Sequence, residues 1–149
     1  MGVLEMPVEE NKALVRHWFG EIIGKSDPTT VAAEADKTFA PEFLDHDGPD
    51  PEHGREAMKK SIPVLMTALS NIKFTIEQLF GEGNLVAVRF RGEATHSGEI
   101  KGIPATGKKI SWNENEIFRF KNGRIVESWG EGNAEEALSQ VGLSFKGRK

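Results

Sequence analysis

Hydrophobic residues follow two different spacings along this chain, and the change comes near its midpoint. In the first half they recur every three or four positions, the period of a helix with one buried face. The first run holds two neighbouring rows, Leu14–Trp18–Ile22 and Val15–Phe19–Ile23. Acidic residues favour the first turn of a helix and glycine its end, which fits Glu9, Glu10 and Gly24 here. We therefore expect a helix that ends near Gly24.

Two more helices are expected before the midpoint. "SDPTTVAAEADKTFAP" predicts a short helix, with Pro28 in its first turn and Pro41 as its stop. "EFLDHDGPDP" predicts a short extended piece that runs into a turn-rich loop. A third helix should extend from about Gly54 to Ser70, bent or shortened by Pro63.

The second half has the alternation typical of strands. Four such segments are separated by turn residues: "IKFTIEQLF", "NLVAVRFRGEATH", "KISWNENEIFRF" and "RIVESW". A short helix, "AEEALSQVG", follows them. Helices followed by an antiparallel meander predict an α+β fold, with the helices on the concave face of a curved sheet. We expect one domain over residues 1–149. Such a fold leaves a cavity between helices and sheet, where an enclosed polar site would lie.

The stretch "WNENEIFRFKNGRIVESW" predicts a hairpin that mixes aromatic and acidic residues. Asn122-Gly123 is a preferred pair for a two-residue turn. A regular hairpin closed by this turn sets Glu116 opposite Trp129. Because side chains alternate along a strand, one face would then carry four aromatic residues and four acids: Trp112, Phe118, Phe120, Trp129, Glu114, Glu116, Glu127 and Glu131.

Acids among aromatic rings suggest proton chemistry. Burial and nearby like charges both raise the pKa of a carboxyl group towards the range useful for general acid or base catalysis. Glu116, expected between Trp112, Phe118 and Trp129, is the best single candidate. The alternative is that this face is exposed to solvent or lies in a subunit contact, with the glutamates simply hydrated. Exposing a stripe of aromatic residues is unfavourable, so we favour the cavity.

His46, in "FLDHDGPD", is a second candidate proton carrier, because histidine titrates near neutrality. A loop histidine held by turn hydrogen bonds is the competing interpretation. His46, Asp47 and His53 lack the spacing that fixes three metal ligands, so no metal site is predicted. Asn133, three residues before Glu136, fits a capping box at the last helix and could also border the cavity.

Composition narrows the function classes. The 149 residues are 38% hydrophobic and 28% charged, as in ordinary globular chains. A net charge of −4 argues against nucleic-acid binding, which needs a basic surface. No apolar run reaches membrane-spanning length, and "MGVLEMPVEENK" does not resemble a signal peptide, so we expect no membrane association and a cytoplasmic location. "GIPATGKK" lacks the Ser or Thr and the following helix of a phosphate-binding loop.

Three stretches together resemble the SnoaL-like polyketide cyclase family: "FLDHDGPDPEHGREAM", "GNLVAVRFRGEATHSGEIKGIPATGKKI" and "IFRFKNGRIVESWGEGNAEEALSQVG". The resemblance covers about residues 10–142. Its superfamily includes nuclear transport factor 2, scytalone dehydratase and ketosteroid isomerase. It implies a cone-shaped, cystatin-like fold and a homodimer. It also implies cofactor-free closure of polyketide rings by an acidic residue four positions after the hairpin Trp.

That position is Asn133 here, and an amide cannot exchange a proton at neutral pH. Catalysis by the family route would need Glu116, Glu131 or His46 instead, and His46 matches a histidine often found in such sequences. We expect a cofactor-independent acid–base enzyme for a small apolar carbonyl compound, with Glu116 and His46 carrying protons, Asn133 binding a substrate oxygen and an apolar wall that includes Trp18. The alternative is a non-catalytic ligand-binding or dimerisation domain that kept the cavity.

Overall fold

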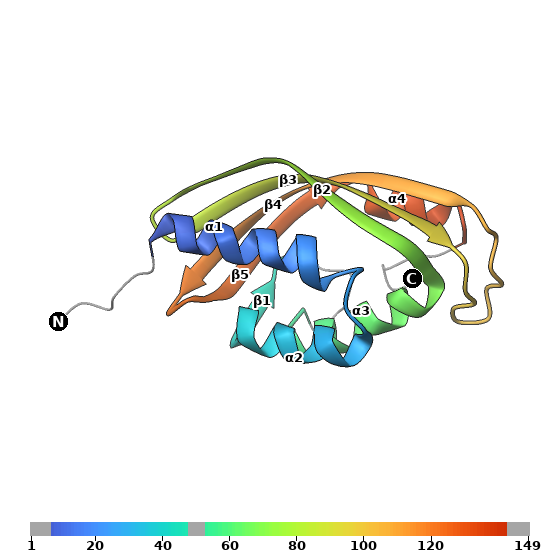
Figure 1. The fold of residues 1–149 in the computed structure, drawn as a ribbon, viewed down its shortest axis with the longest axis horizontal. Coiled ribbons are helices and arrows are strands. Elements are labelled where there is room, and N and C mark those ends of the chain that lie inside the picture. The colour runs from blue at the N-terminus through green and yellow to red at the C-terminus, as the bar shows by residue number, and fades with distance from the viewer. Residues whose placement is uncertain (1–6, 48–52, 143–149) are drawn as a thin grey trace.

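The structure, a computed structural model, describes residues 7–47 and 53–142. The helical elements in these residues are α1 (Val8–His17), η1 (Trp18–Ile22), α2 (Pro28–Thr38), α3 (Arg55–Ala68) and α4 (Ala134–Ser139). The strands are β1 (Phe39–Asp45), β2 (Leu69–Glu82), β3 (Leu85–His96), β4 (Lys109–Lys121) and β5 (Arg124–Gly132). The sheet arches over α1, α2 and α3, while α4 lies near one end of the arch (Figure 1). The predicted α+β class is confirmed.

The described strands form one mixed sheet in the order β1-β5-β4-β3-β2. Strands β2 to β5 make the predicted antiparallel meander. The sheet also gains β1, which pairs with β5 in parallel and starts at Phe39, directly after α2. Pro41 therefore lies inside an edge strand, where a residue without an N–H is tolerated. Most of the turn-rich loop predicted after Asp47 lies outside the described residues.

The first predicted helix changes its winding before it ends. The Ile23 N–H donates to the Trp18 carbonyl oxygen at 3.0 Å, five residues back, so η1 is one wide turn that extends α1. Helix α2 has Pro28 in its first turn, as expected, and the Asp27 carboxylate accepts the Thr30 N–H at 2.9 Å. Wide turns of this kind often lie at functional sites.

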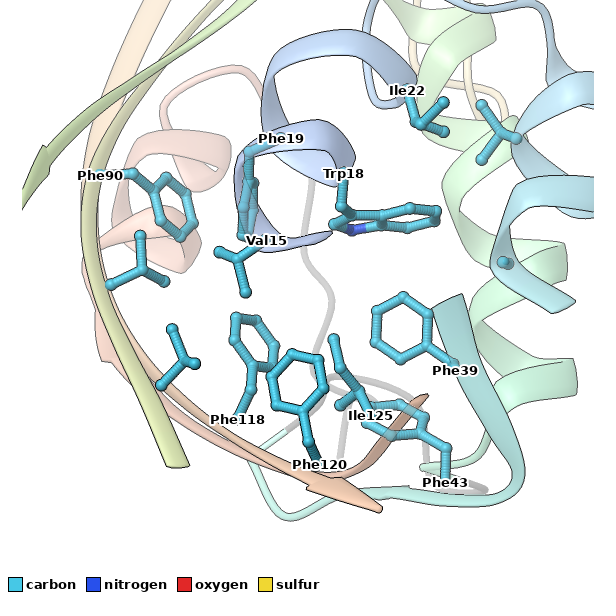
Figure 2. Close-up of a cluster of buried hydrophobic side chains, with 14 residues drawn as sticks. Val15, Trp18, Phe19, Ile22, Phe39, Phe43, Phe90, Phe118, Phe120 and Ile125 are labelled. Atoms are coloured by element: carbon cyan, nitrogen blue, oxygen red, sulfur yellow. The ribbon is translucent and has the colours of Figure 1, made fainter. Parts of the chain in front are cut away.

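The hydrophobic core fills the space between the helices and the concave face of the sheet. Figure 2 shows Trp18 turned towards Phe39 and Phe19 towards Phe90, with ring centroids 5.0 Å and 4.5 Å apart. Each of these rings is almost fully buried. None of the helices in the described parts of the chain is both long and apolar enough to span a membrane.

Candidate functional site

The β4–β5 hairpin closes as predicted but changes register beyond its turn. Asn122 and Gly123 have φ angles of 51° and 77°, which suits the predicted two-residue turn, and Phe120 pairs with Ile125. Arg119, however, pairs with Glu127. Val126 is thus an extra residue in β5, a β-bulge. The prediction of a regular hairpin was wrong from this point on.

The bulge reverses the facing of every later residue in β5, because a one-residue shift moves side chains to the other side of the sheet. Trp129 pairs with Ile117 on the outer face, and Glu131 pairs with Asn115 there. Glu116 instead lies opposite Gly130, and Glu114 lies opposite Gly132. The predicted grouping of four acids with four aromatic rings on one face is therefore wrong: only two of the acids, Glu114 and Glu116, face inward.

Glycine on β5 leaves room for these two inward glutamates. A Cβ atom built on Gly130 would lie 3.1 Å from Glu116 Cγ, and one built on Gly132 would lie 2.9 Å from Glu114 Cγ. Contacts that short leave no space for a side chain. The two glycines of "WGEGN" therefore make a trough in the inner face of the sheet, which the glutamate side chains occupy.

A cavity of about 210 Å³ lies between this face and the helices. Its apolar lining includes Trp18, Phe39, Phe43, Met58, Ile62 and Phe118. The polar lining that the described residues supply is Asp45, His53, Ser61, Glu116 and Ser128. The predictions that Glu116, Phe118 and Trp18 border a common hollow agree with this geometry. An apolar hollow with a few polar groups is the usual form of a small-molecule site.

The inward acids hold their protons unusually tightly. Burial raises the pKa of Glu116 well above the ordinary value for glutamate, and the charges of Glu114, Asp45 and Asp47 raise it further. Burial, followed by the charge of Asp45, raises the pKa of Glu114 to about 7. Glu116 therefore keeps its proton to higher pH than an ordinary glutamate, and a protonated carboxyl can act as a proton donor.

Asp45, at the end of β1, is a cavity residue that the sequence analysis did not select. Burial raises its pKa, and the charge of Asp47 acts in the same direction. Hydrogen bonds from the Asp47 N–H and the Ser128 side chain, together with the charge of His53, work against that rise. A signal was present: Phe43 and Asp45 are two residues apart in an extended segment, so a buried Phe43 implies an inward Asp45.

His53, rather than His46, is the histidine that lines the cavity. Its carbonyl oxygen accepts the Asp45 N–H at 2.8 Å, which fixes the chain between β1 and α3. Its φ angle is 50°, an uncommon conformation for a residue other than glycine. Its Nδ1 atom is buried and has no hydrogen-bond partner among the described residues. No local sequence pattern distinguishes His53 from other loop histidines.

His46 lies in a separate cluster with residues of the outer sheet face. Its ring stacks on Trp129, with centroids 4.8 Å apart and planes 4° apart. Its Nε2 atom is 2.8 Å from Glu127 Oε2, and Glu127 Oε1 is 3.2 Å from Arg119 Nε. His46 is not among the residues that line the cavity with Glu116. The structure does not bring this predicted pair together.

Three other predicted site residues lie beside the cavity or away from it. Trp112 is on the inner face, packed edge-on against Phe74 in a neighbouring part of the core. Asn133 precedes α4 as predicted, but its side chain makes no capping hydrogen bond. Its Oδ1 instead accepts the Asn113 N–H at 2.7 Å and extends the β4–β5 pairing. Glu131 is exposed. The proton-transfer and substrate-binding roles predicted for His46 and Asn133 stay predictions.

Among the residues described, no group of three or more His, Asp or Glu side chains is arranged to hold a metal ion. From the described part of the chain, two carboxyls, two hydroxyls and one imidazole converge on the cavity. These groups can donate, accept and relay protons, and the apolar walls would strengthen each such interaction by excluding water.

The SnoaL-like polyketide cyclase family model matches residues 13–141, which is most of the chain. The chain belongs to this family. Among curated proteins, none matches the chain. Several solved structures do, and the SnoaL-like fold of these relatives is the fold described above.

The first of three such structures is AclR from Streptomyces galilaeus, described as a candidate hydroxylase: it is 26% identical, with a TM-score of 0.75, over 91% of this chain and 83% of AclR. TsrD from Streptomyces laurentii is 25% identical, with a TM-score of 0.74, and the match covers 93% of this chain and 98% of TsrD. IdmH from Streptomyces antibioticus, a candidate polyketide cyclase, is 25% identical, with a TM-score of 0.70. The match covers 89% of this chain and 99% of IdmH. SnoaL-like relatives thus carry more than one kind of functional description.

Proposed function

We propose that this SnoaL-like protein is a cofactor-independent acid–base enzyme that enolises a small apolar carbonyl compound, with Glu116 as the proton donor. The observation that carries the proposal is a half-buried carboxyl in an apolar cavity, where burial raises its pKa well above the ordinary value. No cation forms an ion pair with Glu116 in the described parts of the chain. A purely structural buried acid is usually paired.

The cavity supports a small substrate. Its volume of about 210 Å³ lies below the range of roughly 300–1,000 Å³ that is usual for drug-sized ligands. Its walls are mainly aromatic and aliphatic, so most of the substrate surface should be apolar. A neutral carboxylic acid can hydrogen-bond a carbonyl oxygen and stabilise the negative charge that develops there during enolisation.

Exchange of carbon-bound hydrogen tests this activity without knowledge of the natural substrate. The purified protein is incubated in D₂O with cyclohexanone or acetophenone, and deuterium uptake beside the carbonyl group is followed by NMR. Uptake should exceed the spontaneous rate with the wild-type protein and fall at least about 100-fold with Glu116→Gln, as expected for loss of a general acid. Glu131→Gln is the matched control, because that glutamate is exposed on the outer face.

The alternative, a non-catalytic binding domain, makes a different prediction in the same experiment. It would bind these ketones, seen as a change in Trp18 fluorescence, without accelerating exchange. Wild-type exchange at the spontaneous rate would overturn the catalytic proposal.

We further propose that the outer sheet face pairs with a second copy of this chain. Phe80, Ala87, Ile117 and Trp129 form a row across four strands, and Phe80 and Ile117 are 63% and 44% exposed. Arginine and glutamate residues lie beside the row on β2 and β3, so the face carries both charges, as a surface that meets its own copy about a two-fold axis requires. Light scattering should give a dimer mass for the wild-type protein and a monomer mass for Ile117→Arg. A wild-type monomer would refute this pairing.

A further inference from the structure

Asp45 and Glu116 enter the same cavity from different strands. Asp45 pairs with Ser128 of β5, and Ser128 pairs with Phe118 of β4, two residues from Glu116. Directly opposed residues share a face of the sheet, and so do residues two apart on one strand. All four side chains therefore project from the inner face. Two strand spacings, about 10 Å, separate the β1 and β4 backbones, which leaves space for a small molecule between the two acids.

The two carboxyl groups have different surroundings. Asp45 Oδ1 accepts the Asp47 N–H at 3.1 Å, and Asp45 also has a hydrogen bond from Ser128 and the nearby charge of His53. Each of these contacts stabilises a carboxylate anion. Among the described residues, no hydrogen bond or ion pair reaches the Glu116 carboxyl, which faces the charges of Asp45, Asp47 and Glu114. Of the two groups, Asp45 therefore has the better-stabilised anion, and Glu116 has the surroundings that favour the protonated form.

We propose that Asp45 is the catalytic base that removes the carbon-bound proton, while Glu116 protonates the carbonyl oxygen. This assignment rests on the enolisation proposed above and identifies its second partner. Two acids whose environments separate their proton affinities can divide the acid and base roles between them. Glu114 does not line the cavity, so among the described residues Asp45 is the second carboxyl group available to a bound ketone.

The proposed step is balanced without another reactant. Asp45 takes the proton from the carbon beside the carbonyl, and the C–H electron pair becomes the C=C bond of an enol. The carbonyl π electrons take the proton of Glu116, so Asp45 becomes neutral and Glu116 becomes an anion. Return of a proton from Asp45 to carbon, and of the enol proton to Glu116, restores both groups. In D₂O the returned proton can be a deuteron, which labels the ketone.

His53 and Ser128 would act as positioning residues. His53 holds the Asp45 backbone through the 2.8 Å hydrogen bond to its carbonyl oxygen, and it lines the same cavity. Ser128 is 4% exposed and lies directly beside Asp45 in the sheet. The charge of His53 and the side-chain hydrogen bond of Ser128 both favour the ionised form of Asp45.

The test compares deuterium uptake by cyclohexanone across pH for the wild-type protein, Asp45→Asn, Asp45→Glu and Ser128→Ala, with Glu42→Gln as an exposed control on the same strand. We expect Asp45→Asn to lose at least about 100-fold in rate and Asp45→Glu to recover part of it. Ser128→Ala should move the low-pH limb of the rate profile to higher pH, because Asp45 loses a stabilising donor. Glu42→Gln should match the wild-type protein.

The outcomes separate this inference from the proposed function. Wild-type exchange with an unchanged rate in folded Asp45→Asn would overturn the role of Asp45 and leave Glu116 as the acid of another pair. A low-pH limb that stays in place in Ser128→Ala would also overturn it, even if Asp45→Asn did not fold. Absence of wild-type exchange would instead refute the proposed function itself.

Discussion

Trp129 lies opposite Ile117 on the outer face of the sheet, although a regular hairpin would set it opposite Glu116. The single extra residue, Val126, makes this difference. Trp129 consequently stacks on His46 outside the cavity, and Glu116 faces only glycine across the strand pair. Several measurable properties of the protein depend on this arrangement.

Replacement of Gly132 by alanine should destabilise the fold. The added Cβ would overlap the Asn113 carbonyl oxygen and lie 2.9 Å from Glu114 Cα, and backbone atoms cannot easily move aside. We expect a loss of about 1–3 kcal/mol in the free energy of unfolding, measured by urea denaturation. Gly20→Ala is the control, because no heavy atom lies within 4 Å of its Cβ position. Equal stability of the two variants would contradict the close packing at Gly132.

Replacement of Glu116 by glutamine should leave thermal stability at pH 7 unchanged or slightly raised. The raised pKa means that the site favours the neutral carboxyl, and a neutral amide has nearly the same shape. Thermal melts of Glu116→Gln and the exposed control Glu131→Gln would be compared. A large drop confined to Glu116→Gln would mean that the carboxylate forms a structural ion pair.

Stability should fall as pH rises through neutrality. The folded-state pKa of Glu114 is about 7, against an ordinary value of 4.5, so between these values the native protein binds more protons than the unfolded chain. The free energy of unfolding therefore decreases with increasing pH across this window. Allowing for partial solvent screening, the decrease due to Glu114 should be about 1–3 kcal/mol.

Denaturation at pH 5 and pH 8 would measure this effect, with Glu114→Gln as the test variant. Between these two pH values, the free energy of unfolding should decrease less in the variant than in the wild-type protein. Glu116 should contribute the decrease that remains in the variant. An identical pH dependence in both proteins would place the titration elsewhere.

Replacement of His46 by alanine distinguishes the role predicted from sequence from the role suggested by its contacts. Loss of the stack on Trp129 should cost about 0.5–1.5 kcal/mol in stability. Deuterium exchange should stay within about twofold of the wild-type rate, because His46 does not line the cavity. A 100-fold loss of exchange in a folded variant would instead establish His46 as a proton carrier.

Local patterns predicted most of the fold. Three predicted features depend on near neighbours in the chain: the first helix with Trp18 and Phe19, the antiparallel meander, and the Asn122-Gly123 turn. The structure has each of them. Strand β1 was predicted only as a short extended piece, because its pairing with β5 joins residues more than eighty positions apart. Such a partner leaves no periodic trace in the segment itself.

The candidate site was predicted in part. Glu114 and Glu116 share the inner face because strand alternation continues from the turn along β4 without interruption, although only Glu116 of the two lines the cavity. The side of the sheet that Trp129 and Glu127 occupy was not predictable from that alternation, because the bulge interrupts it. The adjacent apolar pair Ile125-Val126, both buried, was the available indication of an irregularity.

Val126 also affects how homologous hairpins should be compared. If a relative lacks the extra residue, a column-by-column alignment after the turn would match a side chain from the interior of one protein with a surface side chain of the other. Functional roles transferred along such an alignment would be displaced by one position throughout the last strand. Superposition of the backbones, rather than matching of letters, is needed to decide which residues correspond.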